Sequence, residues 1–130
     1  GLRAAELLNA PRHAVSVVSR TAPGTPVSCL NDGVVAGTGS TPGRGLFRHE
    51  PGEEGSTRVE FTYNGRRLVL EVRGAYVKRI RAGIAPLLEK HGLESEAYWK
   101  GVRRLGLEIW EDWHRKALFR TVETKDLPPK

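Results

Sequence analysis

The clearest pattern of apolar and polar positions lies in the middle of the chain. Residues 58–63 alternate between the two kinds of side chain, and residues 66–72 alternate again after Asn64-Gly65. Alternation with a period of two is typical of a strand with one buried face, and Asn-Gly supplies the positive φ angles of a type I′ turn. We therefore expect a β-hairpin whose apolar side chains meet on one face: Val59, Phe61, Tyr63, Leu68, Leu70 and Val72.

The second half of the chain repeats apolar residues every three or four positions, which indicates helices. One helix is expected over residues 75–91, where Pro86 could bend or shorten it and Gly92 fits a C-terminal cap. A longer helix is expected over residues 95–117. Three tryptophans widen or extend its apolar face, and we expect them to pack mainly in the core; an exposed tryptophan cluster would instead indicate an interface. They are Trp99, Trp110 and Trp113.

The other expected elements are shorter. We expect the end of a helix at residues 2–8, a strand at 14–19 and a turn at 21–26. A short strand is expected at residues 46–49 and a closing strand at 118–122. Residues 29–36 fit either a strand or a short helix capped by Asp32 and ended by Gly37. This order predicts an α+β fold, with an antiparallel sheet around a central hairpin packed against helices, two of them in the C-terminal half. Residues 1–123 are expected to form one domain and residues 124–130 a polar tail.

Charge and composition narrow the classes of partner. The net charge is +6, but 21 basic residues are interspersed with 15 acidic ones, and no basic stretch carries interleaved aromatic residues. We therefore expect no nucleic-acid partner. No apolar run approaches the about 20 residues of a membrane helix, so we expect no membrane partner and a soluble protein, cytoplasmic rather than exported. Because the chain lacks methionine, we expect it to be processed or partial, and a leader before Gly1 would not be visible.

Residues 28–45 carry the most concentrated candidate chemistry. They include the only cysteine, Cys29, and a carboxylate three residues later, Asp32. In a helix these two side chains would share a face. A thiolate can ligate a metal or act as a nucleophile, and a cation such as Arg44 would favour it. The alternative is that Cys29 packs as a small buried hydrophobic residue.

The glycine-rich part of this segment suggests an anion site. Backbone N–H groups, hydroxyls and a guanidinium could together bind a small anion; the residues are Thr38, Gly39, Ser40, Thr41 and Arg44. The segment matches neither a P-loop nor the dinucleotide fingerprint, so a purely structural glycine-rich connection is the alternative. The four histidines are His13, His49, His91 and His114. No two of them have the i, i+4 spacing of a helical metal site, and the sequence shows no cluster of four ligands such as structural zinc requires.

Three segments resemble the FmdE-like family, which is named for a component of formylmethanofuran dehydrogenase: residues 1–8, 29–45 and 117–123. The resemblance implies the family's α+β fold and a metal site whose other ligands, two histidines and a cysteine, would precede Gly1. Cys29 matches the family cysteine and Asp32 its aspartate. Val35 stands where the family has glutamine and Ser40 where it has a second cysteine, and a serine hydroxyl is a poor ligand for soft metals.

The residues and the resemblance together favour a small-molecule or metal-binding domain, connected to C1 or molybdenum/tungsten metabolism. Its ligand would contact Asp32 and the residues from Thr38 to Arg44. Its metal, a divalent ion such as zinc, would be bound through Cys29. The alternative is a non-catalytic, homodimeric interaction domain that kept the fold and lost the metal site. An enzyme with Cys29 as nucleophile is a third hypothesis, for which no histidine partner is evident in the sequence.

Overall fold

The structure is a computed structural model, and it describes residues 1–21, 27–112 and 115–128. The chain divides into two compact units. We call residues 1–71 and 120–130 the sheet unit, and residues 72–119 the helical unit. Most of the expected turn at residues 21–26, together with Trp113 and His114, lies outside the described residues. The strands and helices confirm the predicted α+β class.

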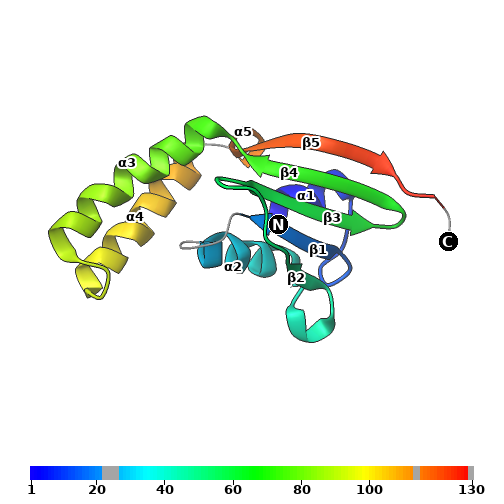
Figure 1. The fold of residues 1–130 in the computed structure, drawn as a ribbon, viewed down its shortest axis with the longest axis horizontal. Helices are drawn as coiled ribbons and strands as arrows, with labels where there is room; N and C mark the ends of the chain where they lie inside the picture. Colours follow the sequence, from blue (N-terminus) through cyan, green and yellow to red (C-terminus); the bar gives the residue numbers. More distant parts are fainter. Residues whose placement is uncertain (22–26, 113–114, 129–130) are drawn as a thin grey trace. The chain divides into compact units, whose positions relative to one another are not determined.

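The sheet unit is built on a five-stranded sheet of order β2-β1-β3-β4-β5 (Figure 1). Its elements, in chain order, are α1 (Leu2–Leu8), β1 (Ser16–Thr21), α2 (Val27–Thr38), the 3-10 helix η1 (Pro42–Arg44), β2 (Phe47–His49), β3 (Thr57–Tyr63), β4 (Arg66–Val72) and β5 (Phe119–Asp126). β5 continues three residues into the segment expected to be a polar tail.

The central hairpin is confirmed. β3 and β4 pair with Val59 opposite Leu70 and Phe61 opposite Leu68, and both Asn64 and Gly65 adopt positive φ angles, 48° and 75°. Phe61 is only 2% exposed. The alternating apolar residues therefore form the buried face of the sheet, as their period of two predicts.

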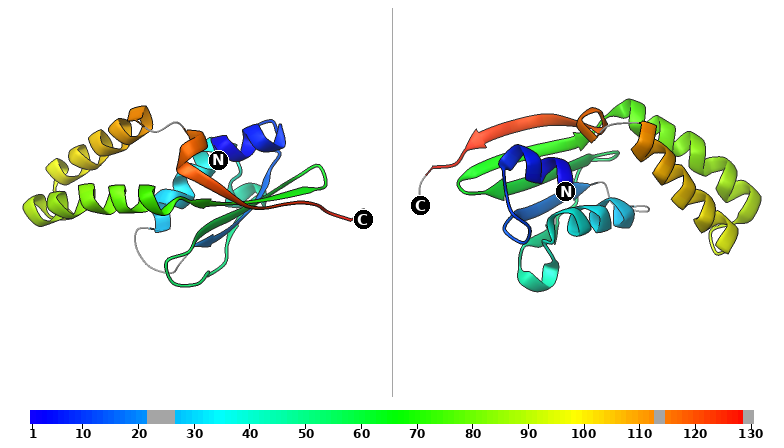
Figure 2. Two further views of the ribbon diagram at one scale, coloured as in Figure 1. Left: turned by 90° about the horizontal axis from the view of Figure 1, so that it is seen from above. Right: turned by 180° about the vertical axis from the view of Figure 1, so that it is seen from behind.

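The expectation of a wholly antiparallel sheet is wrong for one pair of strands. β2 lies parallel to β1, because the chain returns through α2, and parallel neighbours need such a crossover. Residues 29–36 are helical, but α2 begins at Val27, so Asp32 lies in the helix interior instead of capping it, and Gly37 does not end it. α1 and α2 lie on the same face of the sheet (Figure 2).

The opposite face of the sheet carries a ladder of alternating charges, here named the ion-pair ladder. Its pairs join residues of all five strands and the residue that follows β2 at distances of 2.5–3.6 Å: Arg48–Glu50, Glu50–Arg20, Arg20–Glu60, Glu60–Arg67 and Arg67–Glu123. Beside it, the guanidinium groups of Arg120 and Arg58 hydrogen-bond to Glu71 and hold the pKa of that carboxyl below its ordinary value. The charges on this face are therefore paired with opposite charges on neighbouring strands, which stabilises the sheet.

The helical unit consists of α3 (Gly74–His91), α4 (Glu96–Asp112) and α5 (Arg115–Leu118). α3 continues through Pro86, and Gly92 caps it with its N–H bonded to the Leu88 carbonyl. Of the single helix expected over residues 95–117, the structure describes α4 and the part of α5 from Arg115 onward. α3 and α4 pack through two glycines, since a Cβ on Gly83 would lie 2.6 Å from Leu105 and one on Gly101 would lie 2.6 Å from Leu87.

Candidate functional site

The C-terminal ends of β1 and β2 lie side by side under the first half of α2. The two strands are parallel neighbours, and Ser19 of β1 is in register with His49 of β2. α2 connects them along the chain. In a β-α-β arrangement the carboxyl ends of parallel strands are the usual place for a ligand. The polar side chains at this edge are therefore the first candidates for a site.

Four of these side chains form a continuous chain of hydrogen bonds, here named the polar chain. Ser19 Oγ donates to Asn31 Oδ1 at 2.6 Å, and Ser19 Oγ and Thr21 Oγ1 are 3.3 Å apart. Thr21 Oγ1 lies 3.1 Å from His49 Nε2. Because a hydroxyl has one proton, the donor to Ser19 is Thr21, and Thr21 accepts from His49. The direction from His49 to Asn31 therefore places a proton on His49 Nε2.

The middle of the polar chain is buried and its ends are accessible. Ser19 is fully buried and Thr21 is 2% exposed, whereas Asn31 is half-buried and His49 is exposed. Burying two hydroxyls is unfavourable unless each is hydrogen-bonded, and here each bonds to the other. The Asn31 amide nitrogen makes no hydrogen bond to a described residue, so it can donate to a bound molecule.

Cys29 and Asp32 lie on the other side of α2. Both are exposed. Asn31, Val34 and Thr38 follow the inner face of the helix, and with about 100° between successive residues Cys29 lies nearly opposite Asn31. The structure therefore keeps Cys29 and Asp32 on one face, as a helix would, but separates Cys29 from the polar chain. The alternative of a buried Cys29 is wrong.

Thr38, Gly39 and Ser40 hold the end of α2 against its neighbours. The Thr38 hydroxyl donates to the Val34 carbonyl at 2.8 Å and accepts from the Ser40 N–H at 3.1 Å, and the Ser40 hydroxyl donates to the Val15 carbonyl at 2.5 Å. Both side chains are buried. Their hydroxyls are thus used within the fold.

Gly39 is required by its conformation and by a close contact. Its φ is 71°, and a Cβ there would lie 2.4 Å from His13 Nδ1. That nitrogen is 2.9 Å from the Gly39 carbonyl, and the His13 N–H donates to the Thr38 carbonyl at 2.8 Å. His13 therefore tethers the end of α2 to the segment before β1.

Thr41 and Arg44 form the η1 turn that leads into β2. The Thr41 hydroxyl accepts from the Arg44 N–H at 3.3 Å, and the Thr41 carbonyl accepts from Leu46 at 3.2 Å. The Arg44 side chain is exposed. Since η1 follows the C-terminal end of α2 and Cys29 lies near its N-terminal end, the two expected partners belong to opposite ends of the helix.

The sequence pattern indicated His49 only as one of four histidines and did not predict Ser19, Thr21 and Asn31 as a group. A signal for two of them was present. β1 alternates with Val17, Ser19 and Thr21 on its buried face, and polar residues at buried positions are retained where they bond to one another. Asn31 has no such signal, because its partner is distant in the sequence.

No group of three or more metal-ligating side chains occurs within residues 1–21, 27–112 and 115–128. In the same ranges no helix has both the length and the apolar character to span a bilayer. No protein-family model and no curated protein sequence matches the chain. The resemblance to the FmdE-like family therefore stays a prediction.

Proposed function

We propose that the sheet unit binds a small polar molecule at the inner face of α2, as a domain of the FmdE-like type. The observation that carries this proposal is the polar chain from Asn31 to His49. It gives an amide N–H donor at one end and an exposed imidazole at the other, with buried hydroxyls between them. A ligand oxygen could accept a hydrogen bond from the Asn31 amide.

The resemblance adds a connection to C1 or molybdenum/tungsten metabolism, which favours a small anion such as formate or an oxyanion as the ligand. The net charge of +6 supports an anionic ligand electrostatically. For the metal form of the proposal, His49 and Cys29 would each need partners beyond the described residues. The described residues therefore support small-molecule binding better than metal binding.

The test compares the two faces of α2 with neighbouring substitutions. Asn31→Ala removes the inner donor, and Asp32→Ala is its matched control on the outer face. Binding of formate, molybdate and Zn²⁺ is followed by the imidazole signals of His49 in nuclear magnetic resonance spectra, with metal content measured by elemental analysis. We expect Asn31→Ala to abolish the response to an oxyanion and Asp32→Ala to keep it.

Two results would contradict the proposed location. If none of the three probes moves the His49 signals of the unsubstituted protein, the polar chain has only a structural role. If Zn²⁺ is present and is lost in Cys29→Ala but kept in Asn31→Ala, then the outer face of α2 is the site. The second result would restore the metal hypothesis.

A second candidate function is the interaction domain expected above as the alternative, and it is favoured by the exposed aromatic residues of α4. Trp99 is 41% exposed and Trp110 is 50% exposed. This overturns the expectation that these two tryptophans pack in the core, while Trp113 lies outside the described residues. Tryptophan is enriched among the residues that dominate binding energy in interfaces. The two candidate functions involve different units and can both hold.

A further inference from the structure

The exposed face of α4 carries two tryptophans, with the exposed Arg103 between them along the helix. Trp99, Gly106 and Trp110 fall within about 40° of one another around the helix axis, and the exposed Leu107 lies beside them. We call these four residues the α4 stripe. Tyr98 and Ile109, which are buried, lie about a quarter turn away. The stripe is thus separate from the side of α4 that packs within the fold.

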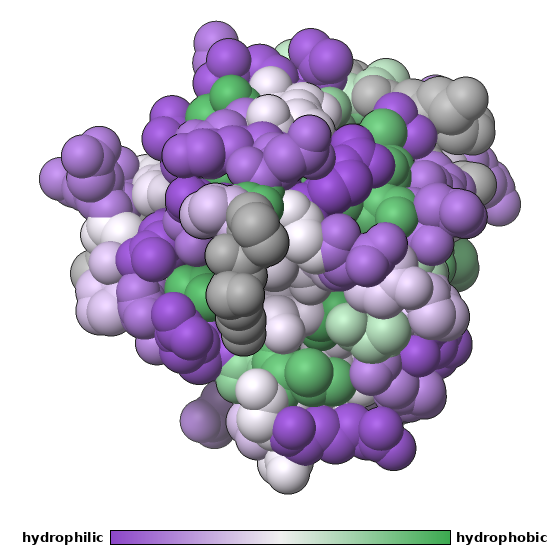
Figure 3. Space-filling view, turned by 90° about the vertical axis from the view of Figure 1, so that its right-hand side faces the viewer, coloured by the Kyte–Doolittle hydropathy of each residue, from purple (hydrophilic) through white to green (hydrophobic). Residues whose placement is uncertain are grey.

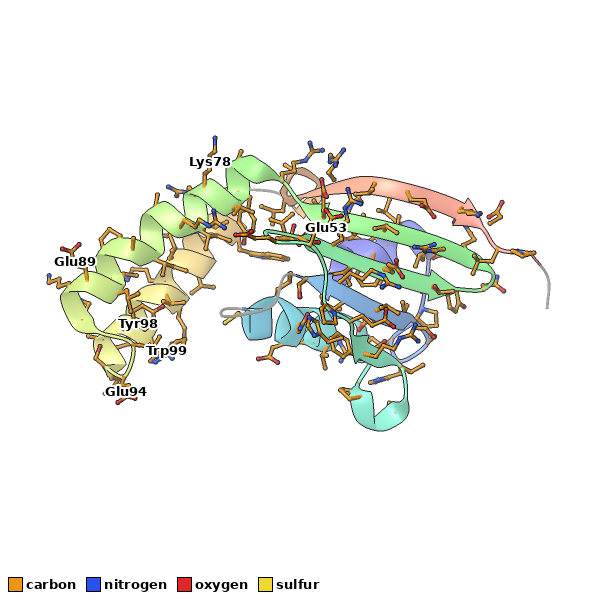
Figure 4. The ribbon with its side chains drawn as sticks, in the orientation of Figure 1. Glu53, Lys78, Glu89, Glu94, Tyr98 and Trp99 are labelled. Atoms are coloured by element: carbon orange, nitrogen blue, oxygen red, sulfur yellow. The ribbon has the colours of Figure 1, made fainter. Side chains whose placement is uncertain are left out.

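The α4 stripe also faces away from α3. α4 contacts α3 through Gly101 and Leu105, and a shallow cavity of about 270 Å³ lies between the two helices on that side. Near the N-terminal end of α4, the Trp99 ring lies edge-on to the Tyr98 ring, with ring centroids 5.0 Å apart (Figure 4). On the face of the molecule drawn in Figure 3, hydrophobic residues form small groups among hydrophilic ones.

The charges of α4 indicate which partner would cover the stripe. Lys100, Arg103 and Arg104 make the first half of the helix basic apart from Glu96 at its start, and the second half carries Glu108, Glu111 and Asp112. A second α4 in the antiparallel direction would place each basic half beside an acidic half. A parallel arrangement would place like charges together, which is unfavourable.

We propose that the α4 stripe binds the same stripe of a second copy of this chain, with the two helices antiparallel. In the register that sets Trp99 opposite the partner's Trp110, Gly106 lies near the two-fold axis. A Cβ on Gly106 would meet nothing within 4 Å in the single chain, so there is room at Gly106 for the second copy's Arg103 side chain, which lies opposite it in this register. The interface is isologous, since each stripe contributes the same residues.

One ion pair follows from this register. Lys100 and Glu111 lie on the same flank of the stripe, and in the dimer Lys100 faces the partner's Glu111, twice by symmetry. Lys100 is 3.3 Å from Glu96 within its own helix, and both side chains are largely exposed, so Lys100 can exchange partners at little cost. The pair selects the antiparallel direction more than it adds affinity.

The expected dimer is weak. Each tryptophan can bury about 150–250 Å², so the four indole groups bury well under the roughly 1,600 Å² of a standard stable interface. We expect a dissociation constant in the micromolar range. The proposal deepens the second candidate function and does not depend on ligand binding at the inner face of α2.

Sedimentation of the full chain between about 1 and 300 µM tests the dimer, because this range brackets a micromolar dissociation constant. We expect Trp110→Ala to weaken dimerisation about tenfold or more, and Gly106→Gln to weaken it while keeping the helix content of the monomer. Leu93→Ala is the matched control, since Leu93 is 56% exposed in the helical unit but outside the stripe.

A charge exchange tests the direction of the helices. Lys100→Glu alone and Glu111→Lys alone should each weaken the dimer about tenfold, and the double variant should restore it. A wild-type chain that stays monomeric at the highest concentration overturns both this proposal and the interaction function for self-association. A dimer insensitive to Trp110→Ala and Gly106→Gln overturns the stripe but leaves an interaction function elsewhere. A dimer that depends on the stripe but is not restored by the double variant overturns the antiparallel register.

Discussion

The sheet unit and the helical unit differ in what they do with their large apolar side chains. The sheet unit buries its alternating apolar residues on one face of the sheet and pairs its charges on the other. The helical unit leaves Trp99, Leu107 and Trp110 exposed. A fold gains stability from burying such residues, so the exposed aromatic residues are the observation behind the proposed contact with a second copy. This contrast supports the proposal that the two units have separate roles.

The largest expected effect is the loss of folding stability on truncating a large side chain, which should differ between the two units. Phe61→Ala removes a side chain that is 2% exposed in the sheet core, and it should lower the free energy of unfolding by about 3–5 kcal/mol. Trp110→Ala should change the stability of the monomer by only about 0.5 kcal/mol. Urea unfolding of dilute protein, followed by circular dichroism, measures both. Equal losses would show that Trp110 is part of the monomer core.

The next effect tests the close packing of α3 and α4. Gly101→Leu forces a side chain into Leu87, 2.6 Å from the first added atom, and it should destabilise the helical unit by about 1–3 kcal/mol. Amide hydrogen exchange should report faster opening of α3 and α4 and little change in β1 and β3. Gly74→Ala, at a glycine of α3 with open space, is the control. Faster exchange throughout the chain would show that the units unfold together.

A smaller effect is expected in the polar chain. Ser19→Ala leaves Thr21 without its buried acceptor and should cost about 1–2 kcal/mol. It should also move the imidazole signals of His49, because Ser19 is connected to His49 through Thr21 in the polar chain. Ser16→Ala, in the same strand but exposed, should be nearly neutral. Unchanged His49 signals in Ser19→Ala would mean that the four groups are not coupled.

The smallest effect concerns the ionic face of the sheet. Hydrogen bonds from Arg120 and Arg58 lower the pKa of Glu71. A carboxyl whose pKa is lower in the folded chain adds stability above its unfolded pKa, and that stability is lost as the pH falls through the folded pKa. Glu71→Gln should therefore lose less stability than the wild type on acidification below about pH 4.5.

The difference should stay under about 1 kcal/mol, because these ion pairs are exposed to solvent. Urea unfolding at pH 7 and at pH 3 gives the two values for each variant. Glu94→Gln, in the connection between α3 and α4, serves as the control and should follow the wild type. If Glu71→Gln is as sensitive to acid as the wild type, then Glu71 does not contribute to the pH dependence of stability.

Local pattern predicted most elements of the fold but not how they assemble. The hairpin followed from alternation and from Asn64-Gly65, and α3 and α4 followed from their apolar repeat and from Gly92. The parallel pairing of β2 with β1 did not follow, because strand direction depends on where α2 carries the chain. The exposure of Trp99 and Trp110 did not follow either, since a helical repeat shows which residues share a face but not what that face contacts.

The candidate site shows the same division. The sequence pattern was enough to identify a chemically rich segment at residues 28–45, with Cys29 and Asp32 on one face of any helix they formed. The packing of α2 on the sheet was needed to show that this face is exposed and that Thr38 and Ser40 use their hydroxyls within the fold. The same packing brings Asn31 to Ser19, whose hydrogen bonds continue to Thr21 and His49. The physical reason is that backbone preference and side-chain period act between near neighbours, whereas these hydrogen bonds join residues from three elements.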